Sequence, residues 1–216
     1  MGRKEPMRVL VLAGTKGGIG KTTLASILAV RAMQEGGRVA LVDADPQSSL
    51  VRWWELRGSP SNPKLYEIDA SEEGLGLLMA EGWQWVVIDT PPGGLHSIND
   101  AISCASFVLI PSRASAIDVE AVDDVVDLCK THRKPYAFVL NAVQSGWTTL
   151  AEDAAHYLSD FGPVLKTRVA CRKPYVSAMA AGKSGAETDR SGAARGEIDA
   201  LWAEISRFIR KPVKAR

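Results

Sequence analysis

GTKGGIGKTT, residues 14–23, is the stretch that decides the fold of this chain. An apolar run, MRVLVLA at residues 7–13, precedes it, and residues 22–35 carry apolar side chains at helical spacing. A strand, a glycine-rich turn and Gly-Lys-Thr at the start of a helix are typical of a loop that wraps a phosphate. The glycines let successive backbone amides face one anion, and the helix N-terminus adds partial positive charge. The stretch therefore predicts a phosphate-binding loop.

Two residues of this loop have positions that carry chemistry. Lys21 is expected to reach the β- and γ-phosphates of a nucleotide, and Thr22 to offer its hydroxyl to Mg²⁺. The spacing departs from the general pattern, because Thr15 stands where the first glycine is usual and the glycine falls one place earlier, at Gly14. A loop of this kind needs a single lysine, so Lys16 requires a separate explanation.

Strand-like and helix-like segments alternate along the rest of the chain. The expected strands are 38–42, 65–68, 83–88, 107–111, 136–140 and 163–169, and the expected helices are 49–56, 116–131, 149–161 and 195–210. Such alternation predicts an α/β fold with a mainly parallel β-sheet and helices on both faces, a three-layer arrangement. No internal repeat or low-complexity region divides the sequence, so we expect one domain over residues 1–216.

Polar side chains follow several of the expected strands. Asp43 and Asp45 come after residues 38–42, Asp89 after 83–88 and Asn141 after 136–140. In parallel sheets, ligands bind at the carboxyl ends of the strands. A lone aspartate there is often a helix cap, and asparagine is a common turn residue. Three aspartates beside one loop favour a site over caps, whereas a turn role for Asn141 stays open.

The composition is that of an ordinary globular chain. It has 216 residues, a formal net charge of +1, 46% hydrophobic and 24% charged residues, and no apolar run as long as a membrane span. Three widely separated cysteines, Cys104, Cys129 and Cys171, are expected to be small core residues, which predicts a cytoplasmic protein. From Lys130 onward there are 15 Lys and Arg against 8 Asp and Glu, so either a polyanionic partner or a solvated basic surface is indicated.

Several motifs together resemble one family. KGGIGKTT at 16–23 resembles the deviant Walker A motif of the ParA/MinD class of P-loop ATPases, a SIMIBI-like group. VDADPQ at 42–47 and VVIDTPPG at 86–93 resemble its second acidic motif and its Walker B strand. The short length, the missing N-terminal helix-turn-helix extension and RVACRKPYVSAMAAGKSGAE at 168–187 resemble the small, ParF-like partition ATPases.

The resemblance implies a role for each polar position. Lys16 corresponds to the family's signature lysine, which reaches across a two-fold dimer interface to the partner's ATP. Asp45 corresponds to the switch aspartate that orients the attacking water, Asp43 is expected near a Mg²⁺-bound water, and Asp89 is the Walker B acid. Asn141 matches the asparagine that reads adenine.

The expected site then falls into three sets of residues, with ATP or ADP and Mg²⁺ as cofactors. The expected catalytic residues are Lys16, Lys21, Asp45 and Asp89, and those expected at Mg²⁺ are Thr22, Asp43 and Asp89. The nucleotide is expected to contact Lys16, Gly17, Gly18, Ile19, Gly20, Lys21, Thr22, Thr23 and Asn141.

The first functional hypothesis is a partition ATPase whose ATP-bound homodimer binds nonspecific DNA on the nucleoid. A small, ParB-like DNA-binding adaptor would stimulate slow hydrolysis and release. Such binding needs cations that contact phosphates without reading bases. The expected DNA contacts are Lys166, Arg168, Arg172, Lys173, Arg207, Arg210, Lys211 and Lys214, with Arg216 in the same basic tail.

Two alternatives use the same fold. A MinD-type ATPase would bind a membrane surface through the amphipathic helix expected at 195–210, although the apolar stripe of that helix also suits the protein core. A metabolic enzyme, such as a carboxylating ligase or a nitrogenase-reductase relative, is the other. The reductase class shares an iron–sulfur cluster held by cysteines, and TPPGGLHS at 90–97 has none. The cargo of a partition cycle is not indicated by the sequence.

Overall fold

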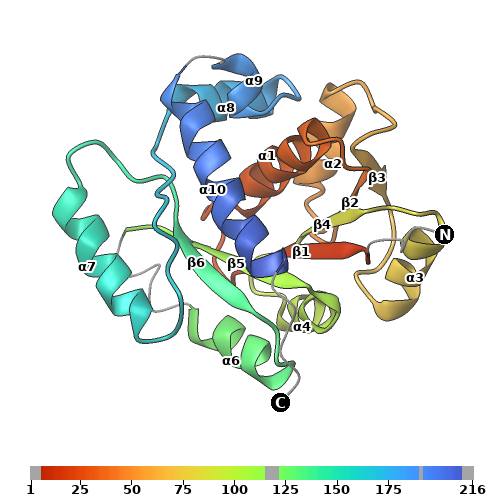
Figure 1. Ribbon diagram of the computed structural model, residues 1–216, viewed down its shortest axis with the longest axis horizontal. Helices are drawn as coiled ribbons and strands as arrows, with labels where there is room; N and C mark the ends of the chain where they lie inside the picture. The colour runs from red at the N-terminus through yellow and green to blue at the C-terminus, as the bar shows by residue number, and fades with distance from the viewer. Residues whose placement is uncertain (1–5, 115–121, 190–191, 211–216) are drawn as a thin grey trace.

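A single parallel β-sheet forms the middle layer of the chain (Figure 1). The computed structural model describes residues 6–114, 122–189 and 192–210. The strands are β1 (Arg8–Leu12), β2 (Val39–Asp43), β3 (Lys64–Tyr66), β4 (Trp85–Asp89), β5 (Phe107–Ser112) and β6 (Tyr136–Leu140). Their order is β3-β2-β4-β1-β5-β6, and every pairing is parallel. The predicted parallel α/β architecture is confirmed.

Helices cover both faces of this sheet (Figure 1). The described helices are α1 (Lys21–Gln34), α2 (Ser49–Leu56), α3 (Glu72–Ala80), α4 (Leu95–Cys104), α6 (Asp123–Thr131), α7 (Thr148–Ser159), α8 (Lys173–Ala180), α9 (Gly185–Thr188) and α10 (Ala193–Arg210). Leu10 and Leu12 of β1 pack with α1, α2 and α10, whereas Val9 and Val11 pack with α3, α4, α6 and α7. This alternation along one strand divides the core into two halves.

Helix α10 belongs to the core rather than to the surface. Its apolar side chains Ile198, Leu201, Trp202 and Ile205 are buried against the sheet, and the rings of Trp202 and Trp85 lie 4.9 Å apart between centroids. The apolar stripe is therefore not available to a bilayer, which removes the feature that suggested membrane binding.

The segment 163–169 is not a strand, contrary to the sequence prediction. It contacts β6 through one isolated bridge, Val164 with Phe138, and through a hydrogen bond from the N–H of Val169 to the carbonyl of Leu140. A second bridge, Ala170 with Val143, lies just beyond both the segment and the strand. Midway along the segment, the carboxylate of Glu204 on α10 accepts hydrogen bonds from the backbone N–H groups of Lys166 and Thr167. The Glu204 side chain thus satisfies the Thr167 amide, which a continued ladder on β6 would use.

Other departures are local. The helix expected at 116–131 is described only from Asp123 onward, and its first residues lie outside the described part. The sequence did not predict α3, α4, α8 or α9, because glycines or prolines interrupt or flank their apolar patterns. Cys129 is buried as expected, but Cys104 is only partly buried and Cys171, in the loop after the extended segment, is exposed.

Replacing Trp202 by alanine is expected to lower the free energy of unfolding by about 3–5 kcal/mol, because it leaves a large cavity between α10 and the sheet. Urea denaturation followed by circular dichroism measures this. Trp147→Ala is the matched control: Trp147 is 39% exposed, and its loss should cost less than about 1 kcal/mol. Equal losses in both variants would show that α10 is not part of the core.

Candidate functional site

The predicted phosphate loop lies between β1 and α1, at the carboxyl end of the central strand. Gly18 and Gly20 have φ angles of 75° and 95°, in the left-handed region that favours glycine. A Cβ on Gly20 would lie 2.1 Å from Nδ2 of Asn141, so this position also has no room for a side chain. Gly20 begins α1 without a side-chain cap, which leaves the first amides of the helix for another acceptor.

The Lys21 side chain lies across the loop. Its Nζ donates hydrogen bonds to the carbonyl oxygens of Gly14 and Lys16, both at 3.0 Å, and the residue is only 6% exposed. Burial lowers the pKa of Lys21, while Asp89 and Asp45 oppose this shift. The Lys21 ammonium is therefore bonded to two neutral carbonyl oxygens, with two carboxylates nearby. A bound anion could draw the ammonium away from these carbonyls.

Asp89, at the end of β4, is fully buried and only partly satisfied. The Thr22 hydroxyl donates to Oδ2 of Asp89 at 2.5 Å, but Oδ1 has no hydrogen-bond partner among the described residues. Burial raises the pKa of Asp89 to about 7, with smaller increases from Asp43 and Asp45, while the Thr22 bond and Lys21 act against the rise. A buried carboxylate oxygen without a donor suits a cation or a water bound to one.

Asp43 and Asp45 lie on the neighbouring strand end. Asp43 pairs in register with Asp89, so the two carboxylates emerge at the same level of the sheet. Oδ1 of Asp43 accepts from the N–H of Asp45 at 3.1 Å, and Oδ2 accepts from Leu50 at 2.9 Å and Val51 at 3.1 Å. Burial raises the pKa of Asp43. Asp43 thus satisfies the N-terminus of α2 and also fixes the backbone of Asp45.

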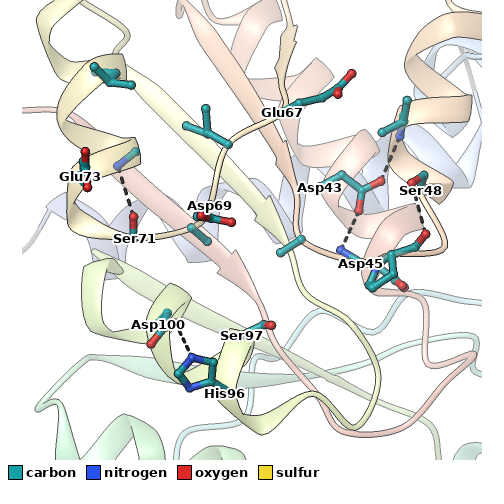
Figure 2. A pocket seen from close by; sticks show the side chains of 17 residues that line it. Asp43, Asp45, Ser48, Glu67, Asp69, Ser71, Glu73, His96, Ser97 and Asp100 are labelled. Atoms are coloured by element: carbon teal, nitrogen blue, oxygen red, sulfur yellow. Dashed lines mark hydrogen bonds and ion pairs between the residues drawn. The ribbon is translucent and has the colours of Figure 1, made fainter.

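A groove opens beside these aspartates (Figure 2). Its volume is about 1010 Å³, and six carboxylates line it: Asp43, Asp45, Glu67, Asp69, Glu73 and Asp100. Apart from His96, which is 3.5 Å from Asp100, no basic side chain of the described residues lines it. Sequence reasoning missed this groove because α3 and α4 were not predicted, although EIDASEE at 67–73 is visibly acidic.

Two further side chains reach the loop from the other side. Nδ2 of Asn141, after β6, donates to the carbonyl of Ile19 at 2.7 Å, and the residue is 8% exposed. Arg113, after β5, donates from Nη2 to the carbonyl of Gly18. Adenine reading by Asn141 stays a prediction. Arg113 was missed, although FVLIPSR places a polar residue directly after a strand, as at the other site positions.

The expected DNA contacts are only partly brought together. Arg172 donates from Nε and Nη2 to Oε1 of Glu197 on α10, at 2.9 and 2.6 Å, so its charge is offset. Arg168 lines the same small cavity as Arg172, and Arg207 lies farther along α10. Lys166 lies in the segment anchored by Glu204, and Lys173 begins α8. The side chains of Arg210, Lys211, Lys214 and Arg216 lie outside the described part.

No described helix is both long and apolar enough to cross a lipid bilayer.

Comparison with known sequences agrees with this geometry. The family described as CobQ/CobB/MinD/ParA nucleotide binding domain matches residues 10–184. Maintenance of carboxysome distribution protein A from Halothiobacillus neapolitanus is 31% identical over 212 residues, which cover 91% of this chain and 95% of that protein. Protein ParA from Rhizobium radiobacter is 28% identical over 152 residues, or 64% and 68% of the two chains.

Solved structures show the same fold. MinD from Aquifex aeolicus has a TM-score of 0.74 at 20% identity, covering 96% of this chain and 100% of that chain. A putative plasmid partition protein from Borrelia burgdorferi bound to AMPPNP also has a TM-score of 0.74, at 18% identity, with 94% and 99% covered. With the loop, the two acidic strand ends and the sheet order in place, the chain belongs to the CobQ/CobB/MinD/ParA family of nucleotide-binding domains.

Proposed function

We propose that this chain is a ParA-type positioning ATPase that binds ATP with Mg²⁺, closes into a homodimer and hydrolyses ATP slowly. The observation that carries the proposal is the cluster of Lys21, Thr22 and the incompletely bonded Asp89 at an uncapped helix N-terminus. These are the parts that phosphoryl transfer requires: an anion cradle, a cation beside it and a site for Mg²⁺.

The phosphates would lie in the loop. The N–H groups of Gly18 and Gly20 have no hydrogen-bond partner within the described ranges, and α1 adds its N-terminal dipole. When a phosphate enters, Lys21 would exchange the carbonyls of Gly14 and Lys16 for a charged acceptor, which forms a stronger hydrogen bond. Phosphate binding would thereby free the backbone carbonyl of Lys16 from Lys21. Lys16 is also the residue whose side chain is expected to reach a second subunit.

Mg²⁺ would be held through the Thr22 hydroxyl, with Asp89 behind it. The unpartnered Oδ1 of Asp89 fits this use. No group of three His, Cys, Asp or Glu side chains in the described segments forms a metal site by itself, which suits an ion that takes much of its coordination from phosphate and water. When bound, Mg²⁺ would neutralise charge that develops on the phosphate oxygens.

Asp45 is the residue proposed to orient the attacking water. It is half-buried, is close enough to Lys21 to raise the pKa of that side chain, and its backbone N–H is fixed by Asp43. A carboxylate held at this position can accept a proton from water near the terminal phosphate. Asp43 then acts on the reaction through Asp45; a direct contact with a Mg²⁺-bound water remains a prediction.

The proposed partners are a second copy of the chain, nonspecific DNA and a ParB-like adaptor that stimulates hydrolysis. Similarity to a carboxysome-distribution protein and to a ParA supports a positioning role, and the cargo is either DNA or a protein assembly. DNA would approach away from the acidic groove, because six carboxylates there repel phosphates. A cytoplasmic, nucleoid-associated location goes with this proposal.

The pH dependence of stability tests the state of Asp89. Folding raises the pKa of Asp89 from 3.8 to about 7, so the folded chain binds more protons than the unfolded chain between these values. Its contribution to the free energy of unfolding therefore falls as pH rises from about 4 to about 7. Urea denaturation at pH 5 and at pH 8 measures this. Between pH 5 and pH 8, the free energy of unfolding of wild type should fall relative to that of Asp89→Asn. A pH-independent difference between the two proteins would contradict the raised pKa of Asp89.

Three variants separate binding, dimerisation and hydrolysis. Asp45→Ala is expected to bind ATP and remain dimeric, with turnover lowered by about 10²-fold or more. Lys16→Ala should bind ATP but stay monomeric, because the cation expected to offset the partner's phosphates is gone. Lys21→Ala should bind ATP weakly or not at all. Light scattering after size exclusion and phosphate release measure these outcomes, and an ATP-dependent Lys16→Ala dimer would refute the assembly role.

DNA binding is expected only with ATP and only at low salt. Charge reversal of Arg210, Lys211 and Lys214 to Glu should weaken binding and reduce the slope of log K against log salt by about 3, since each lost phosphate contact removes roughly one ion. The control is Lys130→Glu with Lys134→Glu, at the end of α6, which packs on the face of the sheet opposite α10. Fluorescence anisotropy with a random duplex measures both. Equal affinity for DNA in the presence of ADP and of ATP would contradict the DNA proposal.

A further inference from the structure

Three side chains donate hydrogen bonds to four carbonyl groups of the phosphate loop. Lys21 bonds to the carbonyls of Gly14 and Lys16, Arg113 bonds to that of Gly18, and Asn141 bonds to that of Ile19. Lys21 belongs to the loop itself, and its role is already accounted for. Arg113 and Asn141 come from strand ends far away in the sequence.

These two bonds fix the direction of two neighbouring peptide units. In a planar trans peptide the N–H lies opposite the C=O. When Arg113 holds the carbonyl of Gly18, the N–H of Ile19 is turned away from Arg113, and when Asn141 holds the carbonyl of Ile19, the N–H of Gly20 is turned away from Asn141. The N–H of Gly20 has no hydrogen-bond partner within the described part of the chain, and that of Ile19 faces only the Lys16 carbonyl across the turn at 17–18, so both can bind an anion.

The sheet sets the two donors side by side. Ser112 at the end of β5 pairs in register with Leu140 of β6, and the carbonyl of Ser112 accepts from the N–H of Asn141 at 2.8 Å. Arg113 and Asn141 are the next residues after this pair. Their separation is therefore fixed by strand pairing rather than by a flexible loop.

The close approach at Gly20 supports a built contact. Nδ2 of Asn141 occupies the place where a side chain at position 20 would begin, 2.1 Å from an ideal Cβ. Asn141 is 8% exposed, so its amide has little access to solvent and relies on Ile19 for a partner. The glycine and the asparagine are thus complementary in shape and in hydrogen bonding.

We propose that Arg113 and Asn141 are positioning residues that preorganise the phosphate loop, through their hydrogen bonds to the carbonyls of Gly18 and Ile19. The inference rests on the proposed phosphate site. It gives Asn141 a role other than reading adenine and gives Arg113 a role where the sequence suggested none. A preorganised cradle binds more tightly because its amides need no reorientation when the anion arrives.

The two roles of Asn141 differ in which ligands they affect. A residue that shapes the loop acts on every phosphate chain, whether or not a base is attached. A residue that reads adenine acts on ATP and has no effect on inorganic tripolyphosphate, which has the same charged groups without the nucleoside. The ratio of the two dissociation constants therefore distinguishes them.

The experiment is isothermal titration of the full chain with Mg²⁺-ATP and with Mg²⁺-tripolyphosphate. Asn141→Ala and Arg113→Ala are each expected to weaken both ligands by about five- to tenfold, the effect of one lost hydrogen bond, and to leave the ratio of dissociation constants unchanged. Arg113→Lys, which keeps a donor, should restore affinity to within about twofold. Arg195→Ala removes an exposed arginine from α10 and should change nothing.

The outcomes separate this inference from the proposed function. If wild type binds neither ligand, the phosphate site itself is wrong. If wild type binds both and the variants equal wild type, or if Asn141→Ala weakens ATP alone, the positioning role is overturned. Thermal unfolding checks that each variant is folded. Arg113 is exposed, so its two variants decide the question even if Asn141→Ala is unstable.

Discussion

A buried carboxylate with one unsatisfied oxygen is the constraint on which the site depends. Asp89 ends a strand that is buried along its whole length, with Thr22 on one oxygen and no described partner on the other. The cost of such a group shows in its pKa, which burial raises to about 7. An apolar residue at this position would make the folded chain more stable, because no charged group would have to be buried. A carboxylate at this position fits the proposed role of Asp89 beside Mg²⁺.

The strand order explains why the other parts meet at this point. β1 lies between β4 and β5, so the loop that follows β1 is flanked by Asp89 on one side and by Arg113 on the other. One strand farther out in each direction are Asp43 and Asn141. The site is therefore acidic on the β2 and β4 side and has amide and guanidinium donors on the β5 and β6 side. That division suits a ligand with Mg²⁺ at one side and phosphate oxygens in the loop.

Sequence patterns predict the strands and their ends well, because a strand buried on both faces is a short apolar run that ends at a polar residue. Lys21, Thr22, Asp43, Asp45, Asp89 and Asn141 are brought together as that logic requires. Features that depend on distant partners are not predictable in this way. The segment 163–169 has strand-like composition, but Glu204 takes its amides. Likewise, the groove needs α3 and α4, which the sequence did not predict because glycines interrupt α3 and directly precede α4.

Helix α2 connects the site to a distant surface. Its N-terminus is bonded to Asp43, and at its other end Arg57 forms a bidentate ion pair with Glu187 of α9 and donates to the carbonyl of Gly182. Trp53, on the same helix, donates from Nε1 to the carbonyl of Lys183. These bonds tie one end of α2 to Asp43 and the other end to the loop between α8 and α9. The acidic groove borders the start of α2, and the basic segment 168–173 leads into α8. Helix α2 therefore lies between the acidic groove and one edge of the basic surface that is proposed to bind DNA.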